Sequence, residues 1–224
     1  MPTLVPRYST TTGSVPSAGA LTTGEVAYNL PDRRIYIKNG GGSVVELPLP
    51  GRWELIKEVT ASNVAAVDLA HGSNGVVLDS TYNEYLLFLN RVFPATNTAI
   101  LYMRTSADAG VNFDSAAGDY YFGTSTSYGS ASFGSAPQIS LTGNVSNSAG
   151  TTGVTGYIHL LDPSSARPHY TFDGVYGVST GSGEVSKCDS SGRRAANAAF
   201  NGVRFLFSSG NISTGTFRLY GRRK

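Results

Sequence analysis

From Arg52 to its end, the chain is built of short apolar runs separated by Gly, Asn, Ser and Pro, and this pattern limits the possible folds more than any other feature. About ten such runs follow one another, among them Trp53–Ala61, Glu84–Phe93 and Gly202–Ser209. No segment keeps a long helical period, and the Ala-rich stretch Gly192–Gly202 can form one helical turn at most. Many short strands with turn residues between them are typical of a sandwich or barrel, so the sequence predicts an all-β fold.

A smaller group of strands precedes this region. Residues 25–29 and 34–38 alternate with a period of two, which is typical of strands with two different faces. Pro31-Asp32 supplies the turn between them, and the triple glycine at 40–42 supplies the next one before a third run at 44–47. The sequence thus predicts a small three-stranded sheet, which is too small to hold a core alone.

The first residues offer little to bury. Residues 1–20 are largely Pro, Ser, Thr and Gly, so we expect an extended or disordered arm. Proline and glycine end the third run, which places a boundary near Gly51. The predicted organisation is an arm at 1–20, a small β module at 21–51 and a β-sandwich domain at 52–224.

The charge balance bears on possible partners. The net charge is +2 and only 14% of residues are charged, so we expect no basic face for nucleic acid, and the cluster Gly221–Lys224 is interpreted as a solvated tail. No apolar run approaches the length of a membrane span, and the N-terminal stretch lacks the apolar core of a signal peptide. We expect neither nucleic-acid binding nor membrane insertion, and assembly in a cytoplasm.

Few residues suggest catalysis or metal binding. The single cysteine, Cys188, is expected to be a buried or inert thiol. Gly177–Gly181 matches the G-x-S-x-G pattern of hydrolases, but no helical sequence follows it, so the match is interpreted as chance. The sequence therefore predicts no enzyme and no cofactor.

The histidines and the clustered aspartates lead to the same expectation. The histidines are far apart in sequence, which does not favour a zinc site; they are His71, His159 and His169. His159 is expected on a sheet face. The aspartates of one segment, Asp108, Asp114 and Asp119, could form a calcium or glycosidase site, but a role in turns is favoured.

One segment has the composition of a binding surface. Gly118–Pro137 places aromatic residues among Gly, Ser and Thr, a mixture that recognition loops use. Aromatic faces also stack on the apolar faces of sugar rings. The alternative is a core strand at Tyr120–Phe122, to which we assign Tyr121, followed by a low-complexity loop at Thr124–Gly134. With a second loop at 162–169, this segment supplies the candidate ligand-binding residues, Tyr120, Tyr128, Phe133, Arg167 and His169.

The N-terminal strands resemble a short module of bacteriophage tail fibres and other virion appendages. The pattern is a Gly-Glu-aliphatic-Ala-x-Asn strand, an Asp turn and a strand with Ile-Tyr; Arg33 stands where that module usually has Gly after the Asp. The segments Thr81–Phe122 and Ser208–Gly221 are similar to domains of phage structural proteins. The residues that carry the N-terminal resemblance are Leu21, Gly24, Glu25, Val26, Ala27, Asn29, Asp32, Ile35 and Tyr36.

The resemblance implies a virion structural protein with a jelly-roll-like sandwich that projects from the particle. The small module would then serve virion attachment or oligomerisation, with a homotrimer as the expected assembly and other virion proteins as partners. The residues assigned to this role are Gly24, Glu25, Tyr28, Asn29, Asp32, Ile35 and Tyr36.

Three functions are compatible with this resemblance. We favour a tail fibre or spike that binds a host surface glycan or receptor through the sandwich. The alternative is a capsid decoration protein, head fibre or tail connector with no receptor contact. An enzyme that trims surface polysaccharide is the least favoured, because the sequence offers no clear pair of close carboxylates.

Overall fold

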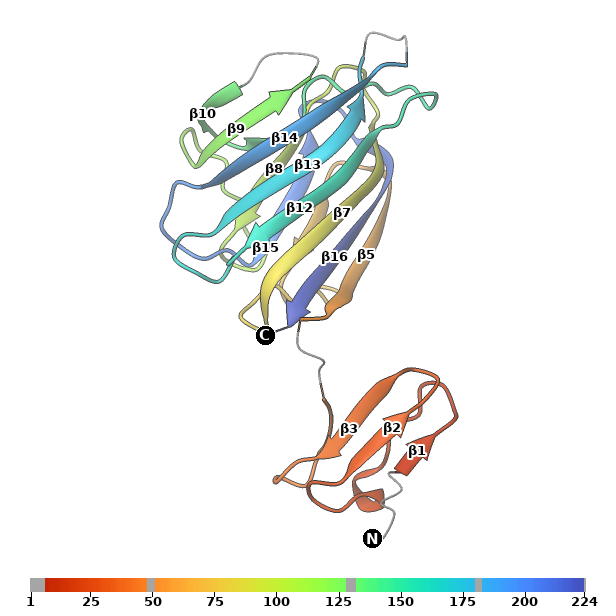
Figure 1. Ribbon diagram of the computed structural model, residues 1–224. Helices are drawn as coiled ribbons and strands as arrows, with labels where there is room; N and C mark the ends of the chain where they lie inside the picture. The colour runs from red at the N-terminus through yellow and green to blue at the C-terminus, as the bar shows by residue number, and fades with distance from the viewer. Residues whose placement is uncertain (1–6, 48–50, 128–131, 180–182, 224) are drawn as a thin grey trace. The chain divides into compact units, whose positions relative to one another are not determined.

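The chain divides into two compact units, Met1–Arg52 and Trp53–Lys224. The computed structural model describes residues 7–47, 51–127, 132–179 and 183–223 (Figure 1). The predicted all-β class is confirmed, and one short 3-10 helix, Ala18–Ala20, is the only helix among these residues. The two units are described separately below.

The first unit contains a four-stranded sheet in the order β1-β2-β3-β4. Strands β2 and β3 form the predicted antiparallel hairpin, and β4 pairs with β3. In the turn of the hairpin, Arg33 has a φ of 54°, the left-handed region that glycine occupies most easily. The strands of this unit are β1 (Arg7–Ser9), β2 (Val26–Asn29), β3 (Arg34–Lys38) and β4 (Val44–Glu46).

The N-terminal arm differs from the expectation where the structure describes it. Strand β1 pairs in parallel with β2, with Tyr8 opposite Tyr28, and adds a fourth strand to the predicted three. The side-chain nitrogen of the buried Asn29 donates to the carbonyl oxygens of Thr11 (3.0 Å) and Ser14 (2.9 Å). Residues 7–20 are therefore ordered by this unit itself, because the side chain of Asn29 supplies donors to a segment that has little to bury.

The second unit contains one sheet of eight strands and one of four. The large sheet has the order β10-β9-β14-β13-β12-β7-β16-β5, and the small sheet has the order β11-β8-β15-β6. The strands are β5 (Trp53–Val64), β6 (Val67–Ala70), β7 (Tyr82–Pro94), β8 (Leu101–Ser106), β9 (Tyr120–Thr126), β10 (Ser132–Ala136), β11 (Ile139–Ser140), β12 (Val154–Leu161), β13 (His169–Gly177), β14 (Val185–Arg194), β15 (Gly202–Phe207) and β16 (Ile212–Arg223).

Eight of these strands have the connectivity of a jelly roll. Strand β5, the first of the eight, pairs with β16, the last. Going inward from both ends of the chain segment, β6 pairs with β15, β7 with β12 and β8 with β11. This is a long antiparallel hairpin wrapped into two sheets, which is the double Greek key of a jelly roll. The strand order, which the sequence left open, therefore agrees with the expected jelly-roll-like sandwich.

The core lies between the two sheets. Phe205 of the small sheet and Phe217 of the large sheet are both fully buried, and their ring centres are 5.3 Å apart. Leu69, Leu87 and Met103 belong to the same buried cluster. Such contacts between the inward-facing residues of two sheets are the main source of stability in a sandwich.

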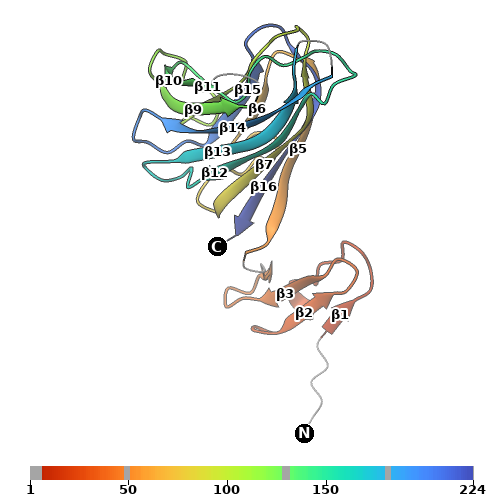
Figure 2. The same cartoon turned by 45° about the horizontal axis from the view of Figure 1, so that its top comes forward.

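The remaining four strands extend the large sheet beyond β12. The hairpin β9–β10 follows β8, and the hairpin β13–β14 follows β12, so both are insertions between strands of the jelly roll. Figure 2 shows the large sheet curving until β9 and β10 lie near β11. On this inner face, the Ser190 hydroxyl donates to the carbonyl oxygen of Ser140 (3.1 Å), and the Cys188 thiol donates to that of Leu141 (2.7 Å).

Strand β14 corrects the sequence-based expectation for this region. No strand was predicted between Ser179 and Gly202, and Gly192–Gly202 was expected to form one helical turn at most. Val185–Arg194 is instead one strand, which pairs with β13 on one side and with β9 on the other. Neighbouring strands on both sides supply the backbone hydrogen bonds, so the weak strand propensity of Ser and Gly does not prevent it from forming.

Candidate functional site

The aromatic segment predicted as a binding surface forms the hairpin β9–β10. The two strands are antiparallel, with Phe133 opposite Gly123. The expected loop at Thr124–Gly134 therefore contains the end of β9 and the start of β10. Tyr128 lies outside the described residues, and a ligand contact by Phe133 stays a prediction.

Two assignments within β9 are wrong. Tyr120, predicted to contact a ligand, has no exposed surface, and its hydroxyl accepts a hydrogen bond from the backbone N–H of Thr105 at 2.7 Å. Burial raises the pKa of the Tyr120 hydroxyl. Tyr121, assigned to the core, is 48% exposed. Successive residues of a strand point to opposite faces, and three aromatic residues in a row do not reveal which face is buried.

The outward face of β13, β14 and β9 carries a channel that crosses these strands. Thr171, Ser191 and Gly123 lie side by side in the sheet register, and all three are small. They line both of two adjacent hollows, one on each side of them. We call this feature the outer channel, with these three residues as its floor.

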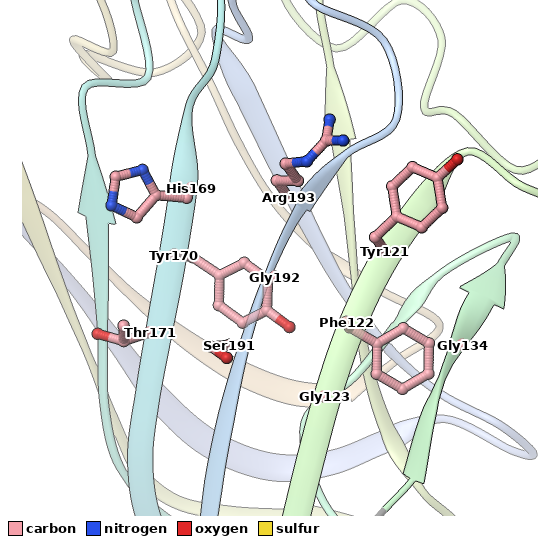
Figure 3. A pocket seen from close by; sticks show the side chains of 10 residues that line it. All are labelled: Tyr121, Phe122, Gly123, Gly134, His169, Tyr170, Thr171, Ser191, Gly192 and Arg193. Atoms are coloured by element: carbon pink, nitrogen blue, oxygen red, sulfur yellow. The ribbon is translucent and has the colours of Figure 1, made fainter.

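The first wall of the outer channel is cationic and aromatic. His169, Arg193 and Tyr121 are register neighbours on β13, β14 and β9, and all three are exposed (Figure 3). The guanidinium carbon of Arg193 lies 5.0 Å from the centre of the Tyr121 ring, within the range of a cation–π contact. The hollow beside this wall has a volume of about 650 Å³.

The second wall is acidic and aromatic. Tyr157, Asp173 and Asp189 are register neighbours on β12, β13 and β14. The ammonium of Lys187 lies 3.6 Å from a carboxylate oxygen of Asp173 and 3.1 Å from one of Asp189. The hydrogen bond to Asp189 and the nearby negative charges raise the pKa of Lys187. The hollow beside this wall has a volume of about 490 Å³.

Together the two walls and the floor offer every kind of contact that a hydroxyl-rich ligand needs. The rings of Tyr121 and Tyr157 present apolar faces, 48% and 42% exposed. The carboxylates of Asp173 and Asp189 accept hydrogen bonds, and the guanidinium of Arg193 donates them. The channel is therefore chemically suited to bind a polar, ring-shaped ligand in an extended position across the strands.

The structure brings together only part of the predicted ligand set. His169 lies in the first wall of the channel. Arg167 is exposed in the preceding loop, where its backbone N–H donates to the hydroxyl of Ser165 (3.2 Å), and it lines neither hollow of the channel. Its contact with a ligand stays a prediction.

Sequence reasoning missed the contribution of β14, namely Asp189, Ser191 and Arg193. A signal was present, because Lys187 and Asp189 alternate with the small residues around them with a period of two. The inward positions of β14, Ser186, Cys188 and Ser190, are small and mostly polar, so the usual apolar alternation is absent.

The other residues considered for chemistry have structural roles. Cys188 is buried as expected, and burial raises the pKa of its thiol to about 12. His159 lies on a sheet face as expected, with its Nε2 3.1 Å from a carboxylate oxygen of Glu84. Gly177 ends β13, and the next strand rather than a helix begins at Val185; Gly181 of the hydrolase-like pattern lies outside the described residues.

The three aspartates are engaged separately. Asp108 accepts hydrogen bonds from Ser106 and Asn112, and Asp119 accepts one from the backbone N–H of Ala116, as residues in turns do. Asp114 instead pairs with the buried Arg194, whose Nε donates at 2.7 Å. Among the described residues, no three His, Cys, Asp or Glu side chains are grouped so that they could hold a metal ion.

No family model, curated protein or solved structure matches the chain. Within residues 7–47, 51–127, 132–179 and 183–223, no helix has both the length and the apolar character that a membrane span requires.

Proposed function

We propose that this chain is a bacteriophage virion protein, a tail fibre or spike, whose β-sandwich attaches to a glycan on the host surface. The observation that carries the proposal is the outer channel, with Tyr121 and Tyr157 on opposite walls and a floor of small residues. Sugar rings combine apolar C–H faces with hydroxyl groups, and the channel supplies aromatic faces, donors and acceptors for both. The resemblance of the N-terminal strands to phage appendages supports the virion assignment.

The first unit would serve assembly, as a homotrimer or with other virion proteins. Its buried side chains among the described residues are Leu21, Ala27, Asn29 and Tyr36, which is a very small core for an independent unit. Contacts with identical copies or with a neighbouring protein can supply the missing burial.

The residues assigned to attachment divide into two groups. Tyr28 (36% exposed) and the partly exposed Ile35 are opposite each other on one face of the hairpin and are available for a partner. The others act within the unit. Glu25 accepts hydrogen bonds from Thr22 and Arg7, and Asp32 accepts one from the backbone of Gly13. Gly24 has a positive φ, Asn29 orders the arm, and Tyr36 is buried.

The proposal is tested by binding of the purified protein to host cells. The full chain and a fragment starting at Arg52 are compared, and the mass of each is measured in solution. We expect both to bind cells and only the full chain to form an oligomer. Binding by neither would contradict the proposal.

A matched pair of variants locates the binding surface. Tyr121→Ala removes the exposed ring of the first wall, and Trp53→Ala removes a ring that is 36% exposed on the same sheet but lines neither hollow of the channel. We expect Tyr121→Ala to weaken cell binding and Trp53→Ala to leave it unchanged. The opposite order would move the binding surface out of the channel.

One observation favours the second candidate, a decoration or connector protein without receptor contact. The outward face of β5, β16 and β7 exposes Trp53, Leu55 and Phe88 (36%, 54% and 39%), and the Phe88 ring lies 5.6 Å from that of Tyr220. These exposed apolar side chains stand beside the ion pairs Arg218–Glu58 and Arg222–Glu84, and a surface of this mixed kind is typical of contact with another protein. Loss of incorporation into particles by Phe88→Ala, together with no cell binding by the unaltered chain, would favour this function.

A further inference from the structure

The glycan-binding proposal can be refined by the charges at the two walls of the outer channel. On the second wall, Asp173 and Asp189 share the ammonium of Lys187, so positive charge lies directly beside the carboxylates. On the first wall, Arg193 and His169 are cross-strand neighbours, whose Cβ atoms lie about 5 Å apart in such a pair. The two walls of the channel therefore differ in charge.

Arg193 is held in place without a carboxylate partner among the described residues. Its Nη1 donates to the carbonyl oxygen of Arg194 at 2.9 Å, and its guanidinium lies over the Tyr121 ring. Its Nε and Nη2 donate to no other atom in the described part of the chain. Elsewhere on the large sheet, Arg218 pairs with Glu58 and Arg222 with Glu84. Arg193 thus presents a positioned cation that has no carboxylate partner among the described residues.

We propose, on the basis of the proposed function, that the outer channel selects an acidic sugar whose carboxylate binds Arg193. Guanidinium N–H groups bind carboxylates through charge-assisted hydrogen bonds, which are stronger than those between neutral groups. The sugar ring stacks against Tyr121 over the small side chains of the floor, and its hydroxyl groups reach Ser191 and Thr171. The second wall, with Asp173 and Asp189, faces the uncharged side of the ligand, because a second carboxylate there would be repelled.

The first experiment measures binding of the full chain to an array of bacterial surface polysaccharides that contains acidic and neutral members. We expect binding to be confined to members with carboxylated sugars. Each polysaccharide that binds is then tested after chemical reduction of its carboxyl groups, which leaves the rest of the sugar unchanged. Reduction is expected to abolish binding. Equal binding to neutral or reduced polysaccharides would overturn the acidic-sugar inference and keep the proposed function, whereas no binding on the array and none to host cells would overturn both.

The second experiment assigns the carboxylate contact to Arg193. Arg193→Gln is expected to lower the affinity about 10- to 100-fold, and Arg193→Lys, which keeps the charge and loses the planar fork, by less. Arg91→Gln is the matched control, because Arg91 is also exposed, lies over an aromatic ring (5.4 Å from the centre of Phe93) and lines neither hollow of the channel. It is expected to bind like the unaltered chain. Thermal unfolding of each variant confirms that the fold is kept, and equal losses in Arg193→Gln and Arg91→Gln would contradict a specific contact.

Discussion

Tyr120 and Tyr121 are adjacent in the chain and lie on opposite faces of one sheet, the first fully buried and the second 48% exposed. The hydroxyl of Tyr120 connects β9 to the small sheet through the backbone N–H of Thr105, while the ring of Tyr121 forms part of the channel wall. The same residue type therefore serves stability at one position and, in our proposal, recognition at the next.

This difference predicts unequal effects of removing the two hydroxyl groups on the free energy of unfolding. Tyr120→Phe leaves the buried N–H of Thr105 without an acceptor, which is expected to lower the free energy of unfolding by about 1–3 kcal/mol. Tyr121→Phe is expected to change it by less than about 0.5 kcal/mol. Urea unfolding of both variants measures the difference, and equal effects would show that the Tyr120 hydrogen bond contributes nothing.

Gly192 lies where β14 approaches both neighbouring strands. A Cβ atom there would lie 2.4 Å from the carbonyl oxygen of Tyr121 and 2.8 Å from the ring of Tyr170. Gly192→Ala is therefore expected to lower the free energy of unfolding by about 1–3 kcal/mol, because the backbone of β9 must move. Gly134→Ala is the control, since a Cβ atom there meets nothing within 4 Å. Chemical denaturation of the two variants should separate them, and equal midpoints would contradict this packing.

The Cys188 thiol is predicted to be unreactive in the folded protein. It is buried, it donates to the carbonyl oxygen of Leu141, and its pKa is raised to about 12, so the reactive thiolate is scarce at pH 8. A thiol reagent such as DTNB is expected to modify it only after unfolding in urea. Rapid reaction of the native protein would show that the β14 region opens readily.

Asp108 is predicted to make stability depend on pH in the acidic range. Hydrogen bonds from the Asn112 backbone and from the side chains of Ser106 and Asn112 lower its pKa from 3.8 to about 2. A lowered folded-state pKa means that the contribution is fully present above about pH 4 and is lost as the pH falls toward 2. Asp108→Ala should therefore lower Tm at pH 7, and the difference from the unaltered chain should shrink as the pH falls from 4 to 2. A difference that is constant over this range would contradict a role for the ionised carboxylate.

The sequence predicted the parts of the fold that depend on strong apolar alternation. The hairpin β2–β3 and the jelly-roll strands with apolar inner faces, such as β7, follow from such patterns. Strand β14 was missed because its inner face consists of small, mostly polar residues, which do not show the apolar alternation of a buried strand. Thr124 and Ser140, for example, both form hydrogen bonds with the inward-facing Ser190.

The candidate site was predictable only in part, for a related reason. His169 begins a strand that the sequence identified, so its place on a sheet was within reach. Arg193 and Asp189 belong to the missed strand, and their alignment with His169 and Asp173 depends on a register that no local pattern specifies.

In the three strands that form the floor of the outer channel, the residue number tells whether a side chain faces outward or inward. In β9, β14 and residues 169–176 of β13, the outward-facing positions are odd-numbered and the inward-facing positions are even-numbered; Tyr121 and Arg193, for example, face out, whereas Tyr120 and Arg194 are buried. A library randomised at the odd positions alone would therefore vary the surface offered to a ligand while every core side chain stays the same. In our proposal, in which the chain is a phage attachment protein, substitutions at these positions change the host without rebuilding the particle that displays the protein.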